Sequence, residues 1–149
     1  MTFVYNDGGR NTAGYKGETG DCVTRAVAIA TEKSYSEVYD ILTKMTQEYS
    51  ETHRDRFAKA IIRGRKTART GIFKVVTTEY LKSLGWQWIP TMQIGSGCKV
   101  HLKAEELPAG RLIARVSKHM VAVVDGVIHD TYDCSREGTR CVYGYYRKE

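Results

Sequence analysis

The sequence predicts a single α+β domain in which N-terminal helices pack on a C-terminal antiparallel sheet. Apolar residues recur at helical spacing in the first half of the chain, whereas beyond Gly85 they alternate with a period of two. Helices followed by strands in this way are typical of α+β domains. At 149 residues, without an internal repeat or a linker, residues 1–149 are expected to form one domain with its own core.

Three helices are expected before Gly85. The first covers about residues 22–31, where apolar side chains recur at helical spacing, namely Val23, Ala26, Val27 and Ala30. Ser34 and Glu37 form a capping box for the second helix, whose buried stripe ends near Tyr49. A third, shorter helix is expected over residues 78–84, with Gly85 as its stop.

Five strands are expected after Gly85, in the segments WQWIPTMQI, RLIARVS, HMVAVVDG, VIHDTYD and RCVYGYY. Asp125-Gly126 between two β-branched runs is a preferred two-residue hairpin turn, which pairs Val124 with Val127. The same register makes His119 and Asp130 diagonal neighbours on one face of the hairpin, close enough for their side chains to meet.

The segment GETGDCVTRAVAIA places Cys22 at the start of the first helix. Unpaired backbone N–H groups at a helix N-terminus favour the thiolate, which is the nucleophilic form of cysteine. If Asp130 oriented the His119 ring, the other ring nitrogen would take the proton from Cys22, as in a thiol triad. The alternatives to a catalytic site are that Cys22 is a buried core cysteine and that His119 and Asp130 form a structural hydrogen-bonded pair.

The order of these residues resembles the papain-like cysteine peptidase superfamily, most of all its compact bacterial and phage-type members. GDCVTRAVAIA supplies Cys22, KHMVAVVDG supplies His119 and VIHDTYD supplies Asp130. GDCVTRA is also similar to the openings of small uncharacterised phage proteins. The resemblance implies a papain-like fold and a hydrolase of amide, peptide or isopeptide bonds, with Cys22 as nucleophile, His119 as base and then acid, and Asp130 as orienting group.

The sequence departs from the superfamily before the cysteine. Papain-like peptidases usually carry a glutamine there as an oxyanion donor, and NTAGYKGETGDC contains none. The backbone N–H of Cys22 is expected to be one donor, with Asn11, Asn6 or Thr19 as candidates for the second. The departure leaves open a slow hydrolase, a deamidase, an acyltransferase or a binding protein that retains the fold.

The net charge of +6 is concentrated between His53 and Arg69, in HRDRFAKAIIRGRKTAR. There one acid, Asp55, is outnumbered by seven basic residues: Arg54, Arg56, Lys59, Arg63, Arg65, Lys66 and Arg69. This segment is either a solvated surface or a site for an acidic protein or a nucleic acid. The alternative function is therefore a basic interaction module. Phe57 is its only aromatic residue, whereas base-stacking surfaces usually have several.

The first residues do not resemble a secretory signal, and no apolar run is long enough to cross a membrane. We therefore expect a cytoplasmic protein, in a bacterial host if the chain is phage-encoded, whose partner is a protein or peptide substrate and not a membrane. Its cysteines are expected to be free, catalytic or metal-bound. A zinc site is a weak alternative. Cys134 and Cys141 are instead expected to be free thiols on either side of a turn, or a disulfide if the protein is outside the cell. The zinc candidates are Cys98, His101, Cys134 and Cys141. No metal or cofactor is expected.

Overall fold

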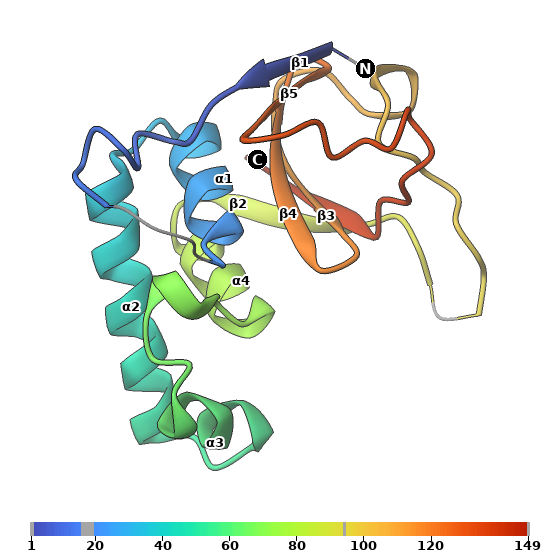
Figure 1. The fold of residues 1–149 in the computed structure, drawn as a ribbon. Coiled ribbons are helices and arrows are strands. Elements are labelled where there is room, and N and C mark those ends of the chain that lie inside the picture. Colours follow the sequence, from blue (N-terminus) through green and yellow to red (C-terminus); the bar gives the residue numbers. More distant parts are fainter. Residues whose placement is uncertain (1, 16–19, 94, 149) are drawn as a thin grey trace.

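The fold is a six-stranded sheet with α-helices gathered on one of its faces, in a computed structural model that describes residues 2–15, 20–93 and 95–148 (Figure 1). The helices are α1 (Cys22–Thr31), α2 (Tyr35–Thr52), α3 (Arg56–Arg63) and α4 (Lys74–Ser83), with short 3₁₀ helices at Ala68–Thr70 and Ala104–Glu106. The strands are β1 (Thr2–Tyr5), β2 (Trp86–Pro90), β3 (Arg111–Val116), β4 (His119–Val124), β5 (Val127–Asp130) and β6 (Gly144–Lys148). The predicted α+β class is confirmed.

The first two helices form where the sequence predicts them. Helix α1 covers residues 22–31, and the Ser34 hydroxyl caps α2 by accepting a hydrogen bond from the Glu37 N–H at 3.2 Å. Helix α4 begins at Lys74, earlier than predicted, because its first turn buries Val76 and Thr77 against the core. No helix in the described part of the chain has the length and apolar character needed to cross a membrane.

Helix α3 was not predicted, and it carries part of the basic segment. Asp55 begins it by accepting a hydrogen bond from the Ala58 N–H at 3.0 Å, and Gly64 follows its last residue. Only Ala58 and Ile61 are buried, so the apolar stripe is short and lies among charged residues. Two buried residues among so many charged ones make too weak an apolar pattern to predict a helix from the sequence.

The strand order in the sheet is β1-β5-β4-β3-β6-β2. The β4–β5 hairpin has the predicted register, with Val124 opposite Val127 and Ala122 opposite His129. Strand β2 lies at one edge of the sheet, where a strand tolerates Pro90. The register therefore fixes where His119 and Asp130 lie, at the end of the hairpin away from its turn.

The prediction of an antiparallel sheet is wrong at one edge, because β1 pairs with β5 in parallel, with Thr2 opposite Val127. The sheet is therefore mixed. Strand β1 has four residues, of which only Phe3 is partly buried. Such a short edge strand has no alternation of buried and exposed side chains for a sequence pattern to reveal.

The core has two parts, one on each face of the sheet. Helix side chains such as Val27 and Leu42 pack against Ile113 and Tyr146 on one face. On the other face, residues 95–110 and 131–143 cover the sheet, and Leu102 is fully buried there (Figure 1). The helical layer and the sheet meet where α1 packs on β4, and this contact positions the site described below.

A disulfide joins Cys98 to Cys141, with a Cα–Cα distance of 5.8 Å. Cys141 is thus neither a free thiol nor the partner of Cys134, which is free and buried. The sequence does not reveal this pairing, because an isolated β-bridge between His101 and Cys141 aligns the two segments without a strand pattern. Disulfides are typical of oxidising compartments, so the cytoplasmic location stays a prediction.

Candidate active site

Cys22 is the first residue of α1 and is partly buried against the start of β4. The His119 imidazole and the Met120 N–H lie close enough to its sulfur to stabilise a negative charge there. Burial raises the pKa of the Cys22 thiol, but the hydrogen bond and charge of His119, the Met120 N–H and the charge of Arg25 outweigh burial, and the pKa is lowered. The environment therefore favours a thiolate at Cys22.

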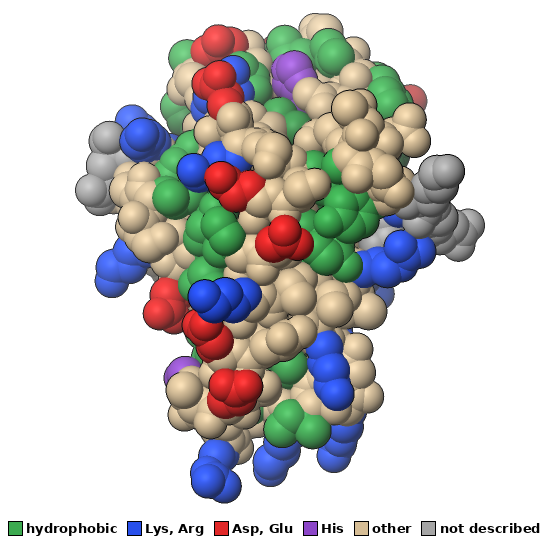
Figure 2. Space-filling view, turned by 90° about the vertical axis from the view of Figure 1, so that its left-hand side faces the viewer, with side chains coloured by type: hydrophobic (Ala, Val, Ile, Leu, Met, Phe, Trp, Pro, Cys, Tyr) green, Lys and Arg blue, Asp and Glu red, His purple; other side chains and the backbone are tan. Residues whose placement is uncertain are grey.

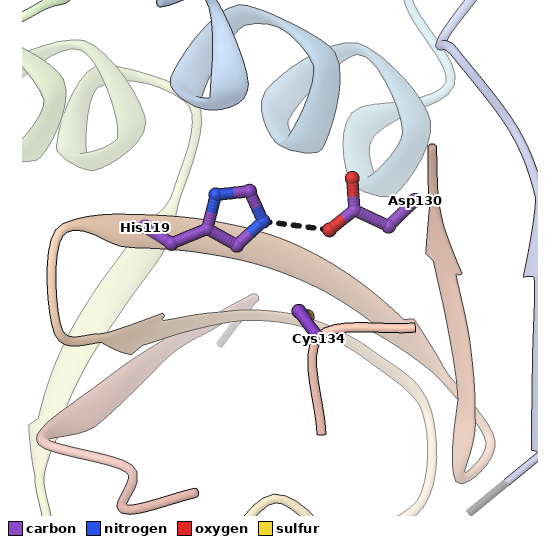
Figure 3. A group of neighbouring side chains, drawn as sticks. All are labelled: His119, Asp130 and Cys134. Atoms are coloured by element: carbon purple, nitrogen blue, oxygen red, sulfur yellow. Dashed lines mark hydrogen bonds and ion pairs between the residues drawn. The ribbon is translucent and has the colours of Figure 1, made fainter. Parts of the chain in front are cut away.

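His119 is the first residue of β4, and its side chain is 8% exposed. Its Nε2 lies 2.6 Å from Oδ2 of Asp130, so the predicted contact between these residues is present (Figure 3). Burial lowers the pKa of His119, but the hydrogen bonds to Asp130, Cys134 and Cys22 raise it to about 11. The surroundings thus favour the charged form of each group, a thiolate at Cys22 and an imidazolium at His119.

Asp130 is the last residue of β5 and is 3% exposed. Its Oδ1 accepts the Thr131 N–H at 2.7 Å and lies 3.5 Å from Nη2 of Arg25. Burial raises the pKa of Asp130, but the His119 hydrogen bond, the Thr131 N–H and Arg25 outweigh burial and lower it. Asp130 is therefore an ionised partner that fixes the His119 ring and leaves Nδ1 for Cys22.

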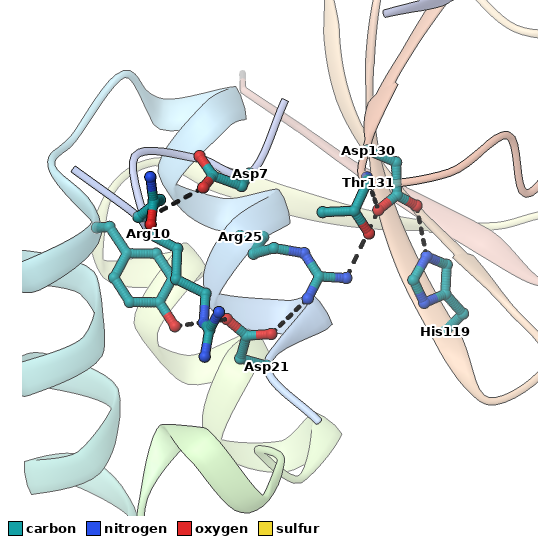
Figure 4. Close-up of polar contacts among 9 residues, drawn as sticks. Asp7, Arg10, Asp21, Arg25, His119, Asp130 and Thr131 are labelled. Carbon is teal, nitrogen blue, oxygen red and sulfur yellow. Dashed lines mark hydrogen bonds and ion pairs between the residues drawn. The ribbon is translucent and has the colours of Figure 1, made fainter. Parts of the chain in front are cut away.

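A buried ionic network behind Cys22 was missed by the sequence reasoning (Figure 4). Asp21 is fully buried and pairs with Arg25, with Arg10 at 3.3 Å and with the Tyr35 hydroxyl. Arg25 spans from Asp21 to Asp130, so it connects the residue before Cys22 to the carboxylate that holds His119. The spacing of four between Asp21 and Arg25 is the sequence signal that could have revealed this network.

A cavity of about 700 Å³ opens in front of Cys22 and His119. The Asp21 side chain makes no capping bond to α1, and the first N–H groups of a helix have no acceptor within the helix. Gly20, Cys22 and Val23 all line the cavity, so the N-terminus of α1 faces it. The cavity thus brings together the Cys22 sulfur, the His119 imidazole and the N-terminus of α1.

Two of the side-chain candidates for oxyanion donor, Asn6 and Asn11, do not line this cavity. The Asn6 amide contacts His129 Nδ1 at 3.3 Å, because the residue follows β1 and sits beside β5. Asn11 belongs to the turn after β1, where its N–H donates to Asp7 at 2.9 Å, and it does not line the cavity either. Neither residue is therefore placed to act at the cavity, whereas Thr19 lies outside the described residues. The backbone N–H of Cys22 remains as donor.

One group of metal-ligating side chains occurs among the described residues: the ligand atoms of His119, Asp130 and Cys134 lie within 4.8 Å of one another (Figure 3). Two ligands of a tetrahedral zinc are about 3.3 Å apart, given bonds of about 2.0 Å. The His119–Asp130 distance of 2.6 Å is shorter, so it fits a hydrogen bond and not two ligands of one ion. The zinc set predicted from sequence is not assembled, since Cys134 lies here and Cys98 is bonded to Cys141.

The seven basic residues of segment 53–69 are all exposed, and three of them, Arg56, Lys59 and Arg63, lie on α3. In Figure 2 blue side chains occupy the lower end of the molecule, the end at which α3 lies in Figure 1. Arg65 also lines the cavity, where its guanidinium lies 4.6 Å from the centre of the Phe73 ring. The basic surface therefore continues into the cavity.

The residues predicted to act together thus share one contact network, from Cys22 through His119 to Asp130. Neither a protein-family model, nor a curated protein, nor a solved structure matches this chain. The papain-like resemblance therefore stays a prediction that rests on three short motifs.

Proposed function

We propose that this protein is a cysteine-dependent hydrolase of amide bonds with a papain-like arrangement, in which Cys22 is the nucleophile. The observation that carries the proposal is the unbroken contact from the Cys22 sulfur through His119 to Asp130, at the wall of a cavity. A nucleophile beside a base that is itself oriented by a third group is the usual signature of covalent catalysis.

The proposed reaction begins when the Cys22 thiolate attacks the carbonyl carbon of a peptide or isopeptide bond. The backbone N–H of Cys22 stabilises the developing oxyanion. The His119 imidazolium then gives its proton to the leaving amine, and a thioester to Cys22 remains. Neutral His119 next takes a proton from water, the hydroxide attacks the thioester carbonyl, and release of the acid restores the thiolate–imidazolium pair.

Asp130 and Arg25 have positioning roles in this proposal. Asp130 holds the imidazole in the orientation that presents Nδ1 to Cys22, and it stabilises the imidazolium. Arg25 holds Asp130 from the opposite side while it pairs with the buried Asp21. The same geometry would serve a deamidase or an acyltransferase, which differ in the leaving amine or in the acceptor that replaces water.

Acyl transfer to Cys22 is testable without the natural substrate. We expect p-nitrophenyl acetate to give a burst of nitrophenolate and an acetyl group that mass spectrometry maps to Cys22. Cys22→Ala should abolish the burst, and His119→Ala should slow it by about 10²-fold or more, the usual contribution of general acid–base catalysis. His129→Ala is the matched control, because this histidine contacts Asn6 and lies away from the cavity. No acetyl group on Cys22 would refute the proposal.

The second candidate function is binding of an acidic protein or nucleic acid through segment 53–69. It is favoured by the exposure of all seven basic side chains, three of which lie on α3. This function would not require Cys22, so the two candidates predict opposite results for the same pair of variants, as set out in the Discussion.

A further inference from the structure

The wall of the cavity in front of Cys22 is strongly basic. No aspartate or glutamate is among the described residues that line it. Its lining includes Arg25, Arg65, Lys74, Arg115 and Lys118. These residues come from four separate parts of the chain: α1, the loop after α3, the start of α4, and the β3–β4 hairpin. The fold thus collects basic side chains around a single space.

Four of these cations have no carboxylate partner in the described part of the chain. Arg25 is neutralised by Asp21 and Asp130. By contrast, Lys74 lies 3.9 Å from the centre of the Trp88 ring, and Arg65 lies over Phe73. Burial lowers the pKa of Lys74, and the like charge of Arg115 lowers it further. Such neighbours repel each other until an anion enters between them.

Two helix N-termini add to this positive field. Phe73 precedes α4 and gives it no side-chain cap, and its carbonyl accepts the Val76 N–H at 3.0 Å. The N–H groups of Lys74 and Val75 have no acceptor within the helix, as is also the case for the first N–H groups of α1. Phe73 and Lys74 line the cavity together with Cys22 and Val23. Helix N-termini favour negative charge, and the unpaired cations around them point independently to an anion.

We propose that the cavity binds a carboxylate of a polypeptide substrate against Lys74, Arg115 and Lys118, beside the bond that Cys22 attacks. This inference rests on the function proposed above and specifies its substrate as acidic. A polypeptide is favoured over a nucleic acid because Arg65 and Lys74 already cover faces of Phe73 and Trp88, which bases would need for stacking. Arg65 extends the same surface towards α3, so further acidic residues of the substrate would lie along it.

Paired alkylating reagents test the charge preference at Cys22 directly. Iodoacetate and iodoacetamide both transfer a carbon to the thiolate sulfur with loss of iodide, but only iodoacetate is an anion. We expect the ratio of the iodoacetate rate to the iodoacetamide rate at Cys22 to exceed that of N-acetylcysteine by at least about tenfold. By Coulomb's law, each unit positive charge about 7 Å from the sulfur in water raises this ratio about threefold.

The double variant Lys74→Gln/Arg115→Gln should reduce this ratio by about tenfold, and added salt should reduce it as well. Lys44→Gln/Lys82→Gln is the matched control, with two exposed lysines outside the cavity and one of them on the same helix as Lys74. Both reagents react with the same thiolate, so the ratio of their rates does not depend on the fraction of Cys22 that is ionised. A ratio equal to that of N-acetylcysteine, or one unaffected by the cavity variant, would overturn the inference.

The source of the carboxylate is identified with the Cys22→Ala variant and three labelled peptides. One is an acetylated, amidated, glycine-rich peptide with two glutamates, the second has glutamines instead, and the third has glutamines and a free C-terminal carboxylate. Tighter binding of the first supports acidic side chains, tighter binding of the third supports a chain terminus, and equal binding of all three overturns the inference. Slow iodoacetamide labelling of Cys22 would instead count against the proposed hydrolase, so the two failures are distinguishable.

Discussion

The pH dependence of Cys22 reactivity is the sharpest test of the thiolate–imidazolium pair. An ordinary thiol with a pKa of about 8.5 is only about 0.3% ionised at about pH 6. Full ionisation there would raise the thiolate population about 300-fold, and the lower nucleophilicity of a more acidic thiolate removes about half of this gain on a logarithmic scale. We therefore expect Cys22 to react with iodoacetamide about 10- to 20-fold faster than an ordinary thiol at that pH.

Two histidine variants identify the source of this reactivity. In His119→Ala the hydrogen bond and positive charge that lower the pKa of Cys22 are lost, burial remains, and the midpoint of the rate profile should move upward. His129→Ala should keep the profile of the unaltered protein. The assay follows iodoacetamide labelling of Cys22 by mass spectrometry across the pH range. A midpoint at or above about pH 8.5 in the unaltered protein would refute the ion pair.

Three further predictions concern stability and binding. Asp21→Asn should lower the free energy of unfolding in urea by about 3–5 kcal/mol, because it leaves the partly buried Arg25 without its nearest carboxylate; a loss below about 1 kcal/mol would contradict this. In the absence of reductant, Cys98→Ser should lower the free energy of unfolding by about 4 kcal/mol, since the disulfide spans a separation of 43 residues. Urea unfolding equal to that of the unaltered protein would show that the disulfide does not form. If segment 53–69 carries the function, Arg63→Gln/Lys66→Gln should weaken retention of the protein on a column with anionic groups and abolish its biological effect, whereas Cys22→Ala should keep the effect. If the protein is instead a hydrolase, Cys22→Ala should abolish the biological effect and leave the retention unchanged.

The sequence predicted those parts of the fold that local rules determine. The helix at residues 22–31 and the hairpin around Asp125-Gly126 depend on apolar spacing and on one turn, and both are observed. The contact between His119 and Asp130 followed from the hairpin register alone.

The missed features depend on contacts between distant parts of the chain. Strand β1 forms only because β5 offers it an edge, and Cys98 meets Cys141 only because two irregular segments run side by side. The environment of Asp21 needs a tyrosine from α2 and an arginine from the turn after β1, which no local pattern places beside it.

The position of Arg25 has a mechanical consequence. It lies on the same helix as Cys22, and its guanidinium reaches across to Asp130 at the end of β5. Cys22 and Asp130 therefore belong to different layers of the fold, and one side chain links the helix that carries Cys22 to the strand that carries Asp130. The ion pairs of Arg25 thus contribute to docking the helical layer on the sheet at the point where the site lies.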